Sequence, residues 1–244
     1  MPWGRHKNEP PFPFLVDDIT REAFGSAGLR GLATNLWPHE CQTCGREFVG
    51  ARPAVHVEVR ESGGTATLHH ADCHPAGWDE LATTSGRESS STATLSTISC
   101  ALLLPTVGEQ TGVESWRPFL LVNPGLEQVA VVKDDGHWRV ATVDYYAQFG
   151  LNTGGEVLRL GDGIPNAIAS LDDRGTITVM LGDLRAGFAA ECEPEVVDRI
   201  RELGGIVLVL GSVLRPDHDT LDLVHEFADA IQARQVAGGW VPLG

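Results

Sequence analysis

Four residues in the first third of the chain have types and spacing suited to binding a metal ion. Cys41 and Cys44 form a C-x2-C pair, and His70 and Cys73 form an H-x2-C pair after 25 intervening residues. Thiolates and a neutral imidazole suit zinc, and three thiolates with one histidine complete a tetrahedral shell. A complete shell leaves no position for water, so the sequence predicts one structural Zn²⁺ ion.

Three histidines lie close to Cys73, and the identity of the imidazole ligand stays open at the level of sequence. His70 gives the H-x2-C spacing, whereas His69 should lie on the opposite face of its strand and His74 directly follows Cys73. We take His70 as the expected ligand, with His69 or His74 as alternatives.

A different choice of ligands would make the protein an enzyme. Zinc deaminases combine an H-x-E element with a P-C-x-x-C element. The chain contains His56-Val57-Glu58 as well as Cys41 and Cys44. The order of the two elements is reversed, and Cys73 would have no role, so we rank this arrangement below the closed shell.

Local patterns place the four ligands around a hairpin. Residues 53–60 alternate between two faces and predict a strand, 62–64 predict a turn, and 65–69 predict the returning strand. Gly45 permits the tight backbone turn after the first ligand pair. A short helix is expected over residues 72–81, so that the second ligand pair lies where the strand gives way to the helix.

This order of knuckle, hairpin and helix resembles a treble-clef zinc finger, and its half-site spacing is similar to that of the first zinc site of LIM domains. The resemblance covers residues 37–82, and the sequence has no second zinc site of the LIM type. Treble clefs include nucleases, ubiquitin ligases, ribosomal proteins and interaction modules. The resemblance therefore implies a zinc-stabilised fold and leaves the function open.

Composition divides the chain into three segments. Residues 1–82 hold a proline-rich start, a helix from Asp17 or Asp18 through Asn35 that glycines interrupt, and the zinc core at 37–82. Residues 83–94 are rich in Ser and Thr and predict a linker. Residues 95–244 predict an acidic α+β domain with a mostly antiparallel sheet, because strand patterns come first and helix patterns late.

The spacing of apolar residues and the positions of turn residues predict the elements of this second domain. Helices are expected over 193–203 and 220–235, with a single helical turn at 144–150. Two similar Asp-Asp turns, at 134–135 and 172–173, leave an internal duplication open, although turn chemistry alone accounts for Asp there. Strands are expected at 98–104, 118–122, 128–133, 137–143, 157–160, 167–170, 176–181 and 206–210.

The charge balance disfavours some partners. The formal net charge is −15, and residues 1–82 carry 7 basic and 11 acidic residues, so most of the negative charge falls after residue 82. Such a field repels nucleic acid from the acidic domain and repels anionic membranes, whereas a protein partner is compatible with it. Only two of the 18 basic residues are lysines, which indicates a GC-rich bacterial genome.

The remaining signals favour a cytoplasmic, reduced protein, because we find no secretory leader and no apolar run long enough to span a membrane. Cys100 and Cys192 belong to no motif and are expected to pack as small hydrophobic residues. No P-loop, nucleophile elbow or dinucleotide fingerprint occurs, so we assign no catalytic or cofactor-binding residue. The sequence thus predicts a non-enzymatic, zinc-stabilised protein-binding or regulatory adaptor. The alternatives are a zinc-dependent hydrolase or deaminase-like enzyme and a nucleic-acid-binding regulator that acts through the zinc module.

Overall fold

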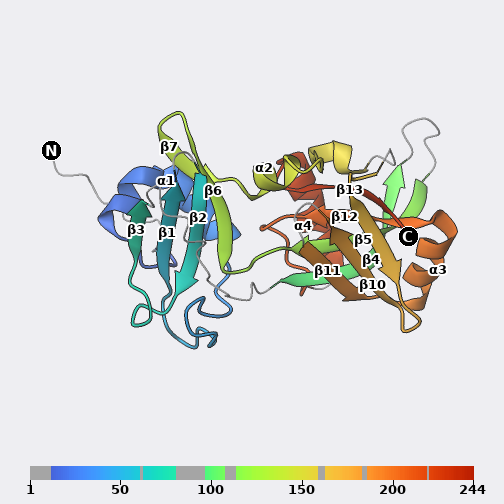
Figure 1. Cartoon of the computed structure of the whole chain (residues 1–244), viewed down its shortest axis with the longest axis horizontal. Helices are drawn as coiled ribbons and strands as arrows, with labels where there is room; N and C mark the ends of the chain where they lie inside the picture. Colours follow the sequence, from blue (N-terminus) through green and yellow to red (C-terminus); the bar gives the residue numbers. More distant parts are fainter. Residues whose placement is uncertain are drawn as a thin grey trace. The chain divides into compact units, whose positions relative to one another are not determined.

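The protein forms two compact units in a computed structural model that describes residues 12–60, 63–80, 97–107, 114–158, 163–182, 186–218 and 220–244 (Figure 1). The first unit comprises residues 1–94 together with 131–140, and the second comprises 95–130 and 141–244. The chain therefore returns to the first unit after the second has begun, whereas the sequence assigned all of 95–244 to one domain. The predicted linker at 83–94 lies outside the described residues.

The first unit begins with helix α1, Asp18–Asn35, where the sequence predicted it. The carboxylate of Asp17 caps the helix by accepting a hydrogen bond from the backbone N of Thr20 at 2.8 Å. Gly25 interrupts the helix with φ 56° and ψ −175°, so the expected break is confirmed. The buried side of the helix consists of Thr20, Phe24, Leu29 and Leu32.

A five-stranded sheet completes this unit, with the strand order β3-β1-β2-β6-β7. Strands β1 and β2 form the predicted antiparallel hairpin, and β6 and β7 form the second one. The edge strand β3 runs parallel to β1. The bounds are β1 Ala54–Arg60, β2 Gly63–His69, β3 Gly77–Glu80, β6 Gln128–Asp134 and β7 His137–Val140.

The two edge strands of this sheet come close together. In a flat sheet, strands at positions one and five are about 19 Å apart. The rings of Trp78 in β3 and Trp138 in β7 nevertheless have centroids only 5.3 Å apart, and Phe24 of α1 packs 6.2 Å from Trp78. The two edges of the sheet therefore bend toward each other, and α1 packs chiefly along β7.

The helix expected over residues 72–81 is wrong for the described part of that range. Residues 71–73 form a turn, and Gly77–Glu80 form strand β3. Pro75 and Gly77 both disfavour a helix interior. Pairing with β1 satisfies the backbone of residues 77–80, and packing of the half-buried Trp78 against Phe24 and Trp138 favours the extended form.

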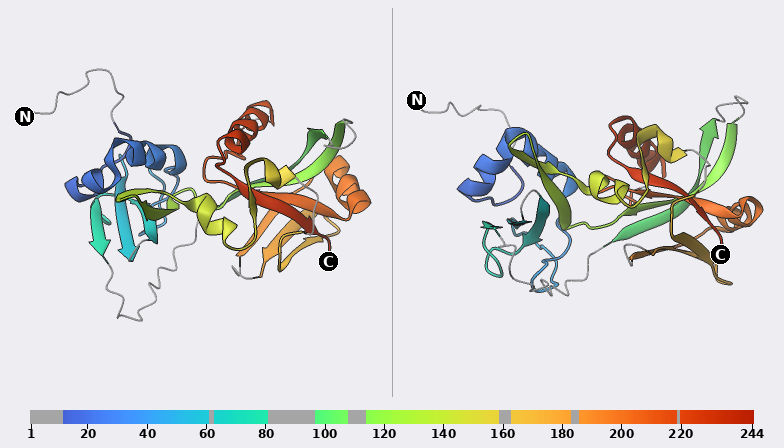
Figure 2. Two further views of the ribbon diagram at one scale, coloured as in Figure 1. Left: turned by 90° about the horizontal axis from the view of Figure 1, so that it is seen from above. Right: turned by 45° about the horizontal axis from the view of Figure 1, so that its top comes forward.

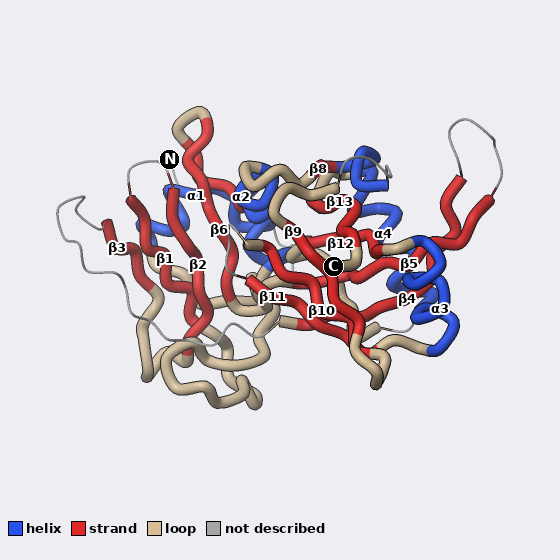
Figure 3. The backbone as a smooth tube through the Cα atoms, turned by 45° about the vertical axis from the view of Figure 1, so that its right-hand side comes forward, coloured by secondary structure: helices blue, strands red, loops and turns tan. Residues whose placement is uncertain are grey.

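The second unit has a five-stranded sheet in the order β4-β5-β12-β13-β8 and a three-stranded antiparallel sheet in the order β11-β10-β9 (Figures 2 and 3). Strand β12 pairs parallel to β5, and the other pairs are antiparallel. The bounds are β4 Ile98–Val107, β5 Glu114–Asn123, β8 Asn152–Thr153, β9 Ala167–Leu171, β10 Thr176–Leu181, β11 Ala186–Glu191, β12 Gly205–Leu210 and β13 Ala237–Pro242.

Alternation along β12 separates two hydrophobic layers. Ile206, Leu208 and Leu210 pack with the three-stranded sheet and helix α3, Pro194–Leu203. Val207 and Val209 pack on the other face with helix α4, Thr220–Gln232. Every residue of β12 is buried, so the prediction of a central apolar strand is confirmed.

The remaining helices are α2, Thr142–Ala147, near its predicted place, and the 3₁₀ helix η1, Gly154–Leu158. The strand expected at 157–160 is therefore wrong for residues 157 and 158. The glycines at 154 and 155 begin a tight turn there, and Val157 packs inward from it. Strands β8, β11 and β13 were not predicted. The α+β class with mostly antiparallel sheet is confirmed, and none of the helices in the described ranges is long and apolar enough to cross a membrane.

Candidate metal centre

The structure brings the four predicted ligands together at one end of the β1–β2 hairpin. One ligand atom from each of Cys41, Cys44, His70 and Cys73 can be chosen so that all four lie within 4.8 Å of one another. Cys41 is buried, Cys44 is exposed, and the other two are half-buried. Three sulfurs and one nitrogen form a donor set that suits a tetrahedral zinc ion.

A backbone knuckle positions the first ligand pair. The N of Gly45 donates to the carbonyl of Cys41 at 2.8 Å, and the N of Cys41 donates to the carbonyl of Arg46 at 2.9 Å. Gly45 has φ 65°, a left-handed conformation that an L side chain would strain. The glycine predicted to allow this turn therefore does so.

A turn after β2 positions the second pair. The backbone N of Cys73 donates to the carbonyl of His70 at 2.9 Å, which closes the turn over residues 70–73. The backbone N of His70 donates to the sulfur of Cys41 at 3.2 Å and so joins the two halves. The predicted helix is not needed, because this single turn brings both side chains to the cluster.

The ring of His70 is oriented for metal binding. Its Nδ1 lies 3.5 Å from the sulfur of Cys44, and its Nε2 lies 3.3 Å from the carbonyl oxygen of Glu47. Because a carbonyl only accepts, this contact fits a hydrogen on Nε2 and a lone pair on Nδ1 that faces the sulfurs. Phe48 packs on the ring with centroids 4.8 Å apart. Such outer contacts are the usual means of orienting a histidine ligand.

Charge around the cluster favours the ionised form of Cys44. The Nε of Arg46 donates to its sulfur at 3.4 Å, and this hydrogen bond lowers the pKa of the Cys44 thiol to about 6. The thiolate in turn raises the pKa of His70 and of Cys73 through hydrogen bonds. Burial opposes ionisation of Cys41, but hydrogen bonds from the backbone of His70, Cys44 and Thr43 together lower its pKa. The first ligand pair, Cys41 and Cys44, therefore forms thiolates more readily than an ordinary cysteine does.

The two alternative histidines lie outside the cluster. His69 is held by two hydroxyl groups, with Nδ1 2.9 Å from the Oγ1 of Thr43 and Nε2 2.8 Å from the Oγ1 of Thr67. The ring of His74 packs against that of His56, with centroids 4.0 Å apart. Occupancy of the cluster by zinc remains a prediction, but His70 is the histidine that the fold gathers with the three cysteines.

The deaminase-like set does not come together in this way. His56 lies in β1, is buried, and contacts His69 and His74 rather than the cysteines. Cys73, which that arrangement left without a role, belongs to the gathered group.

Among the other residues noted in the sequence, Asp172 is a turn residue, and Cys100 and Cys192 are weakly acidic thiols. Asp172 accepts hydrogen bonds from the backbone N of Arg174 and Thr176 at 2.9 and 2.7 Å, as a turn residue does. Burial raises the pKa of Cys100, to about 11, and that of Cys192, so neither is a readily ionised thiol.

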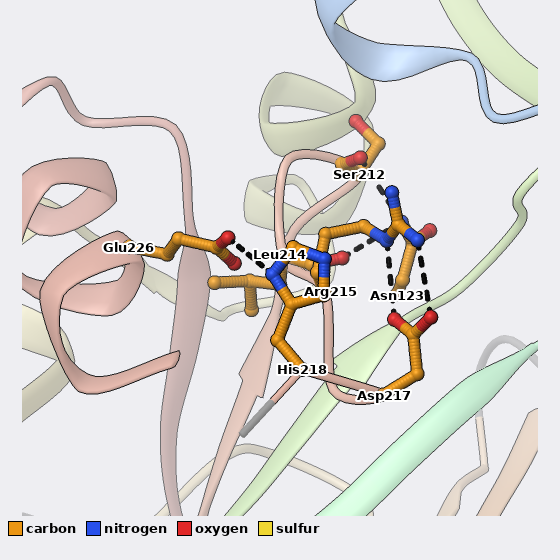
Figure 4. Close-up of polar contacts among 7 residues, drawn as sticks. All are labelled: Asn123, Ser212, Leu214, Arg215, Asp217, His218 and Glu226. Carbon is orange, nitrogen blue, oxygen red and sulfur yellow. Dashed lines mark hydrogen bonds and ion pairs between the residues drawn. The ribbon is translucent and has the colours of Figure 1, made fainter. Parts of the chain in front are cut away.

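One polar network was not predicted by the sequence analysis. It lies in the second unit at the carboxyl ends of the parallel strands β5 and β12 (Figure 4). Arg215 forms two contacts of 3.1 and 3.0 Å with the carboxylate of Asp217, and Nδ1 of His218 lies 2.7 Å from Glu226. The amide of Asn123 donates to the carbonyls of Ser212 and Leu214 at 3.0 Å each.

The carboxyl ends of parallel strands are a frequent place for ligand sites. Here the charged groups pair with one another along the loop that precedes α4. We therefore interpret the network as a set of contacts that hold that loop in its conformation. A sequence signal could have been the cluster of Arg, Asp and His directly after the apolar strand, since polar residues there must be satisfied near the core.

Comparison with protein-family models, with curated proteins and with solved structures gave no match for this chain.

Proposed function

We propose that this protein is a non-enzymatic, zinc-stabilised adaptor that binds another protein. The observation that carries the proposal is the donor set of the cluster, in which three sulfurs and one imidazole nitrogen are gathered by the backbone. Four protein ligands complete a tetrahedral shell around zinc and leave no position for a reacting water. The zinc would then stabilise the first unit in the way that structural zinc stabilises small modules.

We further propose that residues 37–73 are the knuckle and hairpin of a treble-clef-like module in which strand β3 takes the place of the usual helix. The partner is proposed to be a protein with a basic surface, because the chain carries a formal net charge of −15. Nucleic acid is a poorer match to that charge.

The experiment uses the full-length, zinc-loaded protein as bait in quantitative affinity capture from the source organism. Matched baits are the Cys44→Ser variant, which removes a ligand, and the Cys192→Ser variant, which removes a thiol outside the cluster. We expect a direct partner that both wild type and Cys192→Ser retain, that Cys44→Ser loses, and that binds again when purified.

Zinc-dependent turnover is assayed on the same preparations with ester, phosphoester, peptide and nucleoside substrates. The absence of a specific partner, together with turnover that Cys44→Ser abolishes, would overturn the proposal in favour of the hydrolase or deaminase-like alternative.

A further inference from the structure

A second group of side chains whose types can bind metal ions lies near the cysteine cluster in sequence and fold, formed by His56, His74 and Asp79. Nε2 of His56 lies 3.4 Å from Oδ2 of Asp79, and the rings of His56 and His74 have centroids 4.0 Å apart. The register explains the proximity, because His56 of β1 is paired with Gly77 of β3. Residues two apart on a strand share a face, so Asp79 lies on the same face of the sheet as His56.

The space around His56 depends on Gly77. A Cβ at position 77 would lie 3.2 Å from Nδ1 of His56, closer than most side chains tolerate. The absence of a side chain at position 77 therefore leaves room for the imidazole of His56.

His56 is buried and its ring makes no hydrogen bond with the described residues, although Asp79 lies within ion-pair distance of Nε2. Its side chain is 5% exposed, and neither Nδ1 nor Nε2 has a hydrogen-bond partner among the described residues. An imidazole carries one N–H donor and one acceptor when neutral, and leaving such groups buried without a hydrogen bond is unfavourable. A bound ligand on Nε2 removes part of this cost.

The two neighbouring histidines differ in whether a ring nitrogen is available to bind a metal ion. Both nitrogens of His69 are engaged by Thr43 and Thr67. His74, in contrast, has its Nδ1 3.2 Å from the carbonyl oxygen of Pro75. Since that oxygen only accepts, Nδ1 carries the hydrogen, and Nε2 of His74 has a free lone pair.

The distance between His56 and Asp79 matches a shared ion. Two ligand atoms bound at about 2.1 Å to a tetrahedral metal are separated by about 3.4 Å. We propose that His56, His74 and Asp79 form a second site, for a divalent transition metal ion. Two imidazoles and one carboxylate suit zinc and its neighbours better than calcium or magnesium.

The proposed site differs from the cysteine cluster in how readily it should exchange its metal ion. The cysteine cluster is the one group of ligand atoms that the described residues gather within 4.8 Å, so at the second site the ring of His74 turns toward the ion that His56 and Asp79 share. Three protein ligands leave a fourth position for water or for a group from a partner. The second ion is therefore exchangeable, whereas the first is structural, and this inference goes beyond the proposed adaptor function.

The test loads full-length protein with one equivalent of zinc and then titrates it with Co²⁺ under equilibrium dialysis, with both metals measured. We expect one further equivalent of Co²⁺ to bind while the zinc stays in place. X-ray absorption at the cobalt edge should show nitrogen and oxygen neighbours and no sulfur. The variants His74→Ala and Asp79→Asn change partly exposed side chains, and each should weaken Co²⁺ binding by roughly tenfold or more.

Asp72→Asn is the matched control, because Asp72 is an exposed carboxylate in the same segment. It should bind Co²⁺ like wild type, and all three variants should keep their zinc. Failure of wild type to take up a second equivalent would overturn the proposal. Equal Co²⁺ affinity in wild type, His74→Ala and Asp79→Asn would also overturn it, since the ion would then lie elsewhere on the acidic surface.

Discussion

The Nδ1 atom of His70 and the sulfur of Cys44 lie 3.5 Å apart, across the two halves of the cysteine cluster. In a tetrahedral zinc site a nitrogen and a sulfur ligand are about 3.6 Å apart. The two halves come from segments 25 residues apart in sequence, so the β1–β2 hairpin holds them at a separation that one ion can bridge.

Loss of one cluster ligand should release the zinc and destabilise the first unit. We expect Cys44→Ser and His70→Ala each to weaken zinc binding by roughly 100-fold or more, because each removes a direct ligand. Competition with a chromophoric chelator measures the affinity, and thermal unfolding measures the loss of stability. Cys192→Ser should keep wild-type affinity. Retention of tight zinc binding by His70→Ala would instead point to His69 or His74 as the ligand.

Zinc affinity should fall with acidification, and Arg46 should limit how steeply it falls above pH 6. The thiolate binds zinc and the thiol does not, so protons on Cys73 and His70, whose pKa values are raised, compete with the ion over this whole range, whereas protons on Cys44 compete only below its pKa of about 6. Arg46→Ala removes the hydrogen bond that lowers the pKa of Cys44, so zinc affinity should fall more steeply between pH 8 and pH 6 in the variant. Zinc dissociation constants measured from pH 5 to pH 8 test this. Arg30→Ala, at an exposed site on α1, is the control, and identical curves for Arg46→Ala and wild type would contradict the assigned role.

Two glycines of α1 should respond to alanine in opposite directions. A Cβ at position 28 would lie 2.5 Å from the carbonyl oxygen of Trp138 in β7, whereas at position 31 the nearest atom is a methyl of Val140 at 3.7 Å. Gly28→Ala should therefore destabilise the protein by about 2 kcal/mol through overpacking. Gly31→Ala should stabilise it by about 0.5–1 kcal/mol, because alanine favours the helix. Urea unfolding measures both, and a neutral Gly28→Ala would mean that α1 does not approach β7 so closely.

A fragment that ends at residue 96 should not form a stable zinc unit. It lacks β6 and β7, so β2 loses its neighbour in the sheet and α1 loses the strand against which it packs. Circular dichroism and zinc affinity should show a poorly folded fragment that binds zinc more weakly than the whole chain. Joining residues 128–140, which hold β6 and β7, to this fragment through a flexible linker should recover both properties. A fragment as stable as the first unit of the intact protein would support the simpler division of the chain at residues 83–94.

Local patterns predicted much of the fold because the deciding forces were local. Asp17, the glycines of α1 and the alternation of residues 53–60 placed the first helix and strand. Pro194 and Gly204 marked the two ends of α3, where the glycine adopts φ 72°. The short strands β11 and β13 were missed, because their small residues carry little pattern and their burial comes from partners far away in sequence.

By itself, the sequence determined the four residues of the candidate metal centre, since ligand chemistry and spacing are properties of residue types and turns. Only the tertiary structure decided that residues 77–80 form a strand, because pairing with β1 and packing of Trp78 against Trp138 outweigh local preference. It also placed hairpin 131–140 in the first unit and gathered His56 with His74 and Asp79. Those contacts join segments that local periodicity treats as independent, so no pattern within either segment could specify them.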